Sequence, residues 1–372
     1  MVHFNGTEAQ PANQPDLPQP ASPSASSRLL ATLDSPRLTG AHLSRTSILV
    51  KVENADALRV KADVLILKHA QALYGLDKAA YDSFTIAGSS IRLPACGTHQ
   101  FEPAYHILGV DRVLFIGVEP LSDFGYGEIR DFGRRAMTIL WSERPKTRHV
   151  ALTVHGVGFG LDENESFEAE LAGVIEAITQ NEYPEDLEEI TFVERDKSRS
   201  VRLALVLEKL IPTGRLDRTN RGPLDGLDMP AKQTLRSAGY ASASKPRVFV
   251  AMPFAEEMSD TFHYGIQGAV NAAGLLAERA DLESFTGDVL EWVRNRISNS
   301  KLVIADLTSS NPNVYLEVGY AWGKGVPTVL IAKSSAELKF DVRGQRCIVY
   351  SSIKDLEGKL TNELVMLQTK RI

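Results

Sequence analysis

The sequence has 372 residues, 43% of them hydrophobic and 24% charged, which is the composition of an ordinary globular protein. This length exceeds what one hydrophobic core usually supports, so we expect two domains and a tail. The net charge of -6 and the lack of a long basic run argue against duplex nucleic acid as a partner. Cys96 and Cys347 cannot form a disulfide framework or a cysteine-rich metal site, and they fit a reducing compartment.

The ends and hydropathy of the chain indicate a cytosolic protein. No apolar stretch approaches the roughly 20 residues needed to span a bilayer, and the N-terminus lacks the layout of a secretion signal. Residues 1–44 are rich in Pro, Ala, Ser, Gln and Asn, with few large apolar side chains to offset the entropy of ordering. We therefore expect a disordered tail over 1–44.

Residues 45–212 alternate between two kinds of segment. Short aliphatic runs predict buried strands at ILVKVEN, DVLILK, VLFIGV, HVALTV and EITFVE. Amphipathic segments between them predict helices at YGEIRDFGRRAMTIL, FEAELAGVIEAIT and RSVRLALVLEKL. Such alternation predicts an α/β domain with a mostly parallel sheet.

Residues 213–245 mix Gly, Pro, Ser and charge without periodicity, which predicts a linker that contains at most one short helix. The alternation restarts over 246–372. Strands are predicted at RVFVAMPF, KLVIADLT, PTVLIAK and RCIVY, and helices at MSDTFHYGIQGAVNAAGLL, DVLEWVRNRISNS and NPNVYLEVGYAWG. The fold class is therefore α/β, with two three-layer domains and mostly parallel sheets.

The helix predicted at NPNVYLEVGYAWG carries the strongest candidate site. Asn311 suits an N-cap and Pro312 the first helical position, so the helix begins at the carboxyl edge of a strand, where α/β sheets bind ligands. Glu317 is its only charged side chain before Lys324, and apolar residues surround it, which predicts partial burial. Asn313 and Tyr320 lie about one turn away on either side, so the three can line one wall. A glutamate that holds a neighbouring arginine or caps a loop is the alternative.

The second half as a whole resembles a known family. The segments VFVAMPF, ERADLE, VIADLTSSNPNVYLEVGYAWGKGVPTVLI and FDVRGQRCIVY closely resemble the nucleoside 2-deoxyribosyltransferase-like family, a flavodoxin-like group related to TIR domains. The resemblance covers roughly residues 247–360. It implies that Glu317 is the nucleophile that attacks the anomeric carbon of a nucleoside. It also implies a homo-oligomer, since subunits of the family share active sites.

Other residues of the site follow from this resemblance and from their places on the chain. Asp306 ends its strand at the same edge and is expected to orient a sugar hydroxyl or share proton transfer, with a loop cap as the alternative. Glu317 lies early in its predicted helix, so its carboxylate should stay ionised near the positive end of the helix dipole. The expected substrate-binding residues are Met252, Pro253, Phe254, Tyr264, Asp281, Asn311, Asn313 and Tyr320.

One residue departs from the family pattern. Classical transferases have an aspartate six residues before the nucleophile, whereas here that residue is Asn311. Asparagine cannot act as a carboxylic acid, so hydrolysis rather than base exchange, or NAD rather than a nucleoside, is an open alternative.

The first half loosely resembles macro-type α/β domains through its strand pattern and the segment HGVGFG. This segment follows a predicted strand and precedes a helix, so backbone N–H groups could approach a phosphate there, although a tight turn is the alternative. The loop consists of His155, Gly156, Gly158 and Gly160 with their neighbours. The acidic run DENESFEAE after it is interpreted as a solvated first helical turn. No metal or other cofactor is predicted.

These observations leave three hypotheses. The first is an enzyme that cleaves or transfers at the N-glycosidic bond of a nucleoside or nucleotide, with Glu317 as nucleophile. The second is an effector whose macro-like half senses a nucleotide and controls NAD cleavage by the second half. The third is a nucleotide-binding protein without catalysis.

Overall fold

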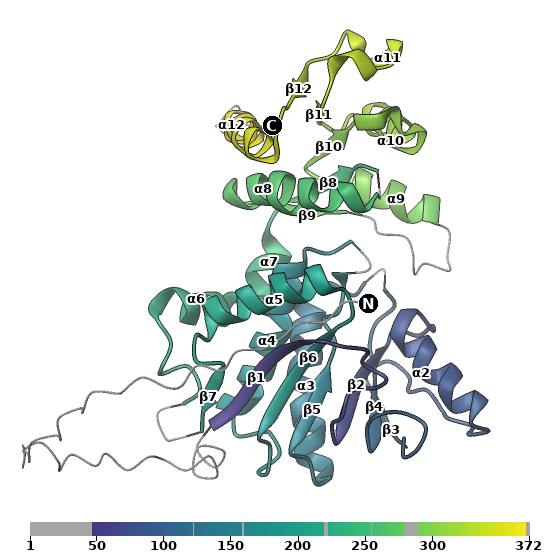
Figure 1. Cartoon of the computed structure of the whole chain (residues 1–372), viewed down its shortest axis with the longest axis vertical. Helices are drawn as coiled ribbons and strands as arrows, with labels where there is room; N and C mark the ends of the chain where they lie inside the picture. The colour runs from purple at the N-terminus through teal and green to yellow at the C-terminus, as the bar shows by residue number, and fades with distance from the viewer. Residues whose placement is uncertain are drawn as a thin grey trace, which may run out of the picture.

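The structure is a computed structural model, and it describes residues 47–121, 123–157, 160–218, 222–253, 255–279 and 289–369. The predicted tail over 1–44 lies outside the described residues, as do Gly158, Phe254 and Asp281. Figure 1 shows two α/β units that follow each other along the chain, each built on its own sheet. Helices cover the sheets on both faces, so the predicted pair of three-layer α/β domains is confirmed.

The first sheet has seven strands in the order β3-β4-β2-β5-β6-β1-β7. The five inner strands are parallel, and the edge strands β3 and β7 run antiparallel to their neighbours. All six positions of β2 are buried, which explains its uninterrupted aliphatic run. The strands are β1 (Ser47–Asn54), β2 (Val64–His69), β3 (His99–Pro103), β4 (Arg112–Gly117), β5 (His149–Leu152), β6 (Glu189–Glu194) and β7 (Arg215–Asp217).

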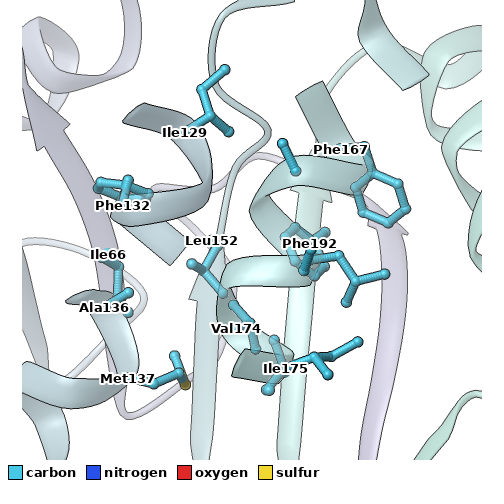
Figure 2. Packing of buried hydrophobic residues seen from close by; sticks show 14 of the residues in the cluster. Ile66, Ile129, Phe132, Ala136, Met137, Leu152, Phe167, Val174, Ile175 and Phe192 are labelled. Atoms are coloured by element: carbon cyan, nitrogen blue, oxygen red, sulfur yellow. The ribbon is translucent and has the colours of Figure 1, made fainter. Parts of the chain in front are cut away.

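The helices of this unit divide between the two faces of the sheet. One face packs against α3 (Tyr126–Glu143), α4 (Glu163–Thr179), α5 (Lys197–Leu210) and α6 (Met229–Ser237). The other packs against α2 (Gly75–Ile86) and the neighbouring loops. Figure 2 shows the first of these cores, where Phe132 and Ala136 of α3 lie with Leu152 of β5 and Val174 of α4.

Helices α3 and α4 cross with their backbones in contact. A Cβ atom at Gly133 would collide with the carbonyl oxygen of Glu170, and one at Gly173 would collide with that of Arg130. Glycine is therefore required on both helices for steric reasons alone, since neither residue has a positive φ.

The segment 213–245 differs from the linker that we predicted. It contains β7, α6 and the short helix α7 (Tyr240–Ser244) rather than one short helix. Leu216, Ala231, Leu235 and Ala238 are buried in the core of the first unit. The sequence signal was weak because these elements are short and each buries only one or two side chains.

The second sheet has five parallel strands in the order β12-β11-β10-β8-β9. Numbered along this domain and read from β9, the order is 2-1-3-4-5, the flavodoxin-like arrangement that the sequence resemblance implies. The strands are β8 (Arg247–Ala251), β9 (Leu276–Glu278), β10 (Leu302–Asp306), β11 (Thr328–Ala332) and β12 (Cys347–Val349).

One face of this sheet packs against the π-helix η3 (Thr261–Gln267), α8 (Gly268–Ala272) and α12 (Ile353–Thr369). The other packs against α9 (Val289–Ser298), α10 (Pro312–Gly323) and α11 (Phe340–Arg343). The helix predicted over 258–276 is wrong at its end, because α8 stops at Ala272 and Leu276 begins β9. Gly274 has φ +71°, a conformation that ends the helix and that other residues rarely adopt.

None of the helices within the described ranges is long and apolar enough to cross a bilayer.

The crossing of α3 and α4 gives a stability prediction. Gly133→Ala should lower the free energy of unfolding by about 2 kcal/mol, because the added methyl group forces two packed helices apart. Gly127→Ala on the same helix is the matched control, since a Cβ there meets no atom within 4 Å. Chemical denaturation followed by circular dichroism measures both. Equal stability of the two variants would show that the crossing is not tightly packed.

Candidate functional site

The carboxyl edge of the second sheet holds the candidate site. In a 2-1-3-4-5 sheet, the connections that follow the first and third strands, here β8 and β10, run in opposite directions. Ligands bind in the crevice between the carboxyl ends of these two strands. Helix α10 starts six residues after β10 ends, so its first turns lie at this edge. Asn311 caps the helix by accepting a hydrogen bond from the N–H of Asn313 at 2.9 Å, and Pro312 is at the first position, as predicted.

Glu317 is half-buried on α10, which confirms the predicted partial burial. Among the described residues we find no hydrogen bond or ion pair to its carboxyl group. Burial raises the pKa of Glu317 from 4.5 to about 7. The expectation of a fully ionised carboxylate is therefore wrong, because the loss of hydration outweighs the helix dipole. Near neutral pH the group is divided between its two protonation states, as nucleophiles and proton-transfer groups in active sites often are.

The stripe of α10 that carries Glu317 runs along α9. The phenol oxygen of Tyr320 lies 3.3 Å from Ser298 Oγ on α9, and the Arg294 guanidinium is 5.7 Å from the centre of the Tyr320 ring. Asn313 and Tyr320 are four residues before and three residues after Glu317, so they share its stripe. Asn313 is exposed and Tyr320 is half-buried. Asn313, Glu317 and Tyr320, which were predicted to line one wall, therefore lie on one face of α10.

Asp306 is fully buried and both of its oxygens are occupied. Oδ1 accepts a hydrogen bond from the N–H of Thr308 at 2.9 Å, and Oδ2 accepts one from the Tyr350 hydroxyl at 2.8 Å. Burial raises the pKa of Asp306, while the hydrogen bonds from Thr308 and Tyr350 oppose that rise. This arrangement matches the alternative role as a loop cap: Asp306 fixes the turn that leads into α10.

The remaining predicted substrate-binding residues lie at different depths. Met252 and Pro253 are buried just beyond the end of β8, whereas the side chain of Tyr264 on η3 is 54% exposed. Phe254 and Asp281 are outside the described residues. Within the described residues, no hydrogen bond, ion pair or ring contact joins Met252, Pro253 or Tyr264 to Glu317, so the structure does not bring these residues together with the proposed nucleophile.

Arg279 is a residue of this edge that the sequence analysis missed. Its guanidinium lies 4.4 Å from the centre of the Phe262 ring on η3, and its Nη1 is 3.9 Å from Met252 Sδ. Arg279, the residue that follows β9, therefore contacts Met252, the residue that follows β8. The signal was present, since Arg279 belongs to the ERADLE segment from which only Asp281 was selected.

The loop proposed to bind phosphate in the first domain is held by buried side chains. Glu170 on α4 has no exposed surface, and its Oε2 accepts a hydrogen bond from the His155 N–H at 3.1 Å. The same oxygen is 3.1 Å from His155 Nδ1. Gly156 and Gly160 have φ of +87° and +84°, so both need glycine, and Gly158 is outside the described residues. His155 thus has a structural partner within the first domain.

The N-terminus of α4 is already capped by a carboxylate. Asp162 Oδ1 accepts hydrogen bonds from the N–H groups of Asn164 at 3.0 Å and Glu165 at 3.1 Å. A phosphate at this helix end would meet that carboxylate, so the free N–H groups invoked for phosphate binding are occupied. The acidic run is also not solvated as interpreted: Asp162 and Glu163 are 1% and 3% exposed. Side chains from both domains lie against them.

The two domains meet at these acidic residues. Asp162 Oδ2 accepts a hydrogen bond from Gln267 Nε2 of η3 at 2.6 Å. Glu163 binds Arg202 of α5 through two hydrogen bonds of 2.5 and 3.0 Å, and its Oε1 lies 3.6 Å from His263 Nδ1. Burial raises the pKa of Asp162 to about 6, and the hydrogen bond from Gln267 opposes that rise. Two candidate regions that the sequence analysis treated separately are therefore neighbours.

No group of three or more His, Cys, Asp or Glu side chains is placed to hold a metal ion within the ranges that the structure describes.

The raised pKa of Glu317 predicts a pH-dependent effect on stability. The folded protein binds this proton more tightly than the unfolded chain, so the stability contributed by the group falls as pH rises from about 4.5 to about 7. Glu317→Gln should therefore be more stable than wild type at pH 8, by on the order of 2 kcal/mol, and nearly equal to it at pH 4. The exposed Glu257→Gln is the control. Denaturant titrations at both pH values measure the difference, and a pH-independent difference would contradict the assignment.

The chain matches no family model and no curated protein. Solved structures similar to it include the macrodomain of Oceanobacillus iheyensis with ADP, at 14% identity and TM-score 0.34, covering 45% of this chain and 97% of that one. A mutant of that macrodomain with ADPR has 14% identity and TM-score 0.32 over 44% of this chain and 93% of that one. The form with MES bound has 14% identity and TM-score 0.33 over 44% and 91%.

Proposed function

We propose that the second domain cleaves or transfers at the N-glycosidic bond of a nucleoside or nucleotide, with Glu317 as the nucleophile. The observation that supports this best is a half-buried carboxyl group that has no partner among the described residues, on the helix that follows the third strand of a 2-1-3-4-5 sheet. A carboxyl group buried only for packing would normally be paired, as Asp306 and Glu163 are. Glu317 is instead available to a ligand.

The chemistry requires the ionised form of Glu317. Its oxygen forms a bond to the anomeric carbon as the bond from that carbon to the base nitrogen breaks, and the electron pair leaves with the base. The positive charge that develops on the sugar is stabilised by the carboxylate close to it. Water, or a second base, then attacks the same carbon and releases Glu317. The departing base needs a proton, unless the nitrogen that joins it to the sugar already carries a positive charge.

This requirement favours NAD as a second candidate substrate. Asn311 occupies the position at which the classical transferases carry an aspartate, and an amide supplies no proton. The nicotinamide of NAD is attached through a positively charged nitrogen, so it leaves as a neutral base without protonation. Cleavage of NAD therefore needs the nucleophile and a water molecule but no acid at position 311.

Replacing the nucleophile tests the proposal. Glu317→Gln should lower the rate of base release by at least about a thousandfold, because no covalent sugar ester can form. The full chain is incubated with a panel of nucleosides, deoxynucleotides and NAD, and free base is measured by chromatography. Glu257→Gln is the control that should keep wild-type activity. Retained activity in a folded Glu317→Gln protein would remove Glu317 from the mechanism.

The pH profile is a second, independent test. Since the pKa of Glu317 is raised to about 7, the fraction of ionised nucleophile increases between about pH 6 and pH 8. Base release by the wild-type chain should rise over this interval and level off above it. A rate already constant from pH 5 upward would mean that the reacting carboxylate has an ordinary pKa and is a different group.

A further inference from the structure

The buried boundary between the domains suggests how the first domain acts on the site of the second. Asp162, Glu163 and Gln267 are each no more than 3% exposed, and they come from α4 and η3, elements about a hundred residues apart in the sequence. Hydrogen bonds between buried charged and polar groups are costly to break, because each group loses its partner without regaining water. The boundary therefore contains a buried polar connection between the two units.

Asp162 has two functions in this connection. One oxygen caps α4, and the other accepts the hydrogen bond from Gln267. Its own N–H donates to the Tyr126 hydroxyl at the start of α3, with a length of 2.9 Å. The residue thus ends the loop 155–161 and fixes it to α3, to α4 and to the second domain at once. A displacement of the loop cannot leave Gln267 unaffected.

On the other side, Gln267 is the last residue of the π-helix η3. Its Oε1 lies 3.0 Å from His263 Nδ1, one turn earlier, and His263 in turn approaches Glu163. Gln267 and His263 of η3 are thus in contact with Asp162 and Glu163, the consecutive acidic residues at the start of α4. A π-helix is less stable than an α-helix of the same length, so it depends on such contacts to persist.

The same π-helix contributes to the cluster of side chains beyond the ends of β8 and β9. It carries Phe262, whose ring lies 4.4 Å from the Arg279 guanidinium, and Arg279 in turn approaches Met252. A second contact reinforces the arrangement, because a Cβ atom at Gly160 would lie 2.7 Å from the carbonyl oxygen of Arg279. The loop of the first domain therefore touches this cluster directly and also holds η3 through Asp162.

We propose that Gln267 is a positioning residue through which Asp162 of the first domain sets the conformation of η3, and with it the cluster of Phe262, Arg279 and Met252 at the carboxyl edge of the second sheet. This inference rests on the proposed function for its effect on catalysis, but the coupling itself is a property of the fold. Its consequence is that a displacement of Asp162 reaches η3 through the hydrogen bond to Gln267, beside the contacts of Glu163 with His263 and of Gly160 with Arg279. Coupling of this kind requires an element with two arrangements, and the proposal assigns that role to η3.

Hydrogen exchange on the full chain tests the coupling without any need for activity. Gln267→Leu should speed amide exchange at least tenfold in segment 155–165 of the first domain, as well as in 258–272. Asn271→Ala is the matched control, because Asn271 is exposed on the adjoining helix α8 and should change neither segment. Faster exchange in 258–272 alone would overturn the proposal.

A second variant keeps the test decisive if Gln267→Leu folds poorly. Gln267→Glu places a second carboxyl group against Asp162, so the two groups repel each other at pH 8 but can share a proton at pH 5. Exchange in 155–165 should therefore be fast at pH 8 and return to the wild-type pattern at pH 5, after correction for intrinsic rates. Exchange in 155–165 that stays at the wild-type level at pH 8 would also overturn the proposal.

The effect on catalysis is then measured separately. For any substrate that the wild-type chain cleaves, Gln267→Leu should raise KM at least fivefold, while the apparent pKa of the rate stays that of Glu317. An unchanged KM with altered exchange would limit the coupling to structure and overturn the positioning role. Loss of activity in every variant and in wild type would count against the proposed function but not against the coupling seen by exchange.

Discussion

A carboxylate removed from water must be surrounded by donors, and this constraint determines how the two domains fit together. Asp162 and Glu163 meet it with Gln267 of one domain and Arg202 of the other. Glu278, at the end of β9, meets it with Arg296 at 2.8 Å and has the Tyr126 hydroxyl of the first domain 3.5 Å away. Removing the second domain would take Gln267 away from Asp162, and removing the first would take the Tyr126 hydroxyl away from Glu278, so these contacts make the boundary specific.

The same constraint shows how the two carboxyl groups of the candidate site differ. Asp306 has its full complement of donors and behaves as a part of the turn before α10. Glu317 is less buried and has no such partner in the part of the chain that the structure describes, and its pKa is raised by the loss of hydration. The sequence showed the residue type of both groups and their positions at the sheet edge. Only the hydrogen-bond partners, which the sequence does not show, distinguish the two.

Long, strongly periodic segments were predictable from the sequence, including the strands β2, β4 and β10 and the helices α3, α4 and α10. Short elements were not, because a three-residue strand such as β9 or β7 is too brief to show a period. The contact between the domains was also beyond a sequence argument. An acidic first turn on α4 has the same sequence pattern whether it faces water or Gln267, and only the tertiary structure decides. The resemblance pointed to α10 as the site helix, and that assignment stays a prediction, but it could not show which residues of the first domain contact η3.

Leu276 on β9 has no exposed surface and packs within the core cluster of the first domain, although it belongs to the sheet of the second. The hydrophobic interior therefore continues across the boundary that the polar residues mark. If the second domain were joined to a different N-terminal domain, Leu276 would lack its apolar packing partners and Gln267 its hydrogen bond to Asp162. The two domains are thus expected to be inherited together rather than exchanged as independent modules.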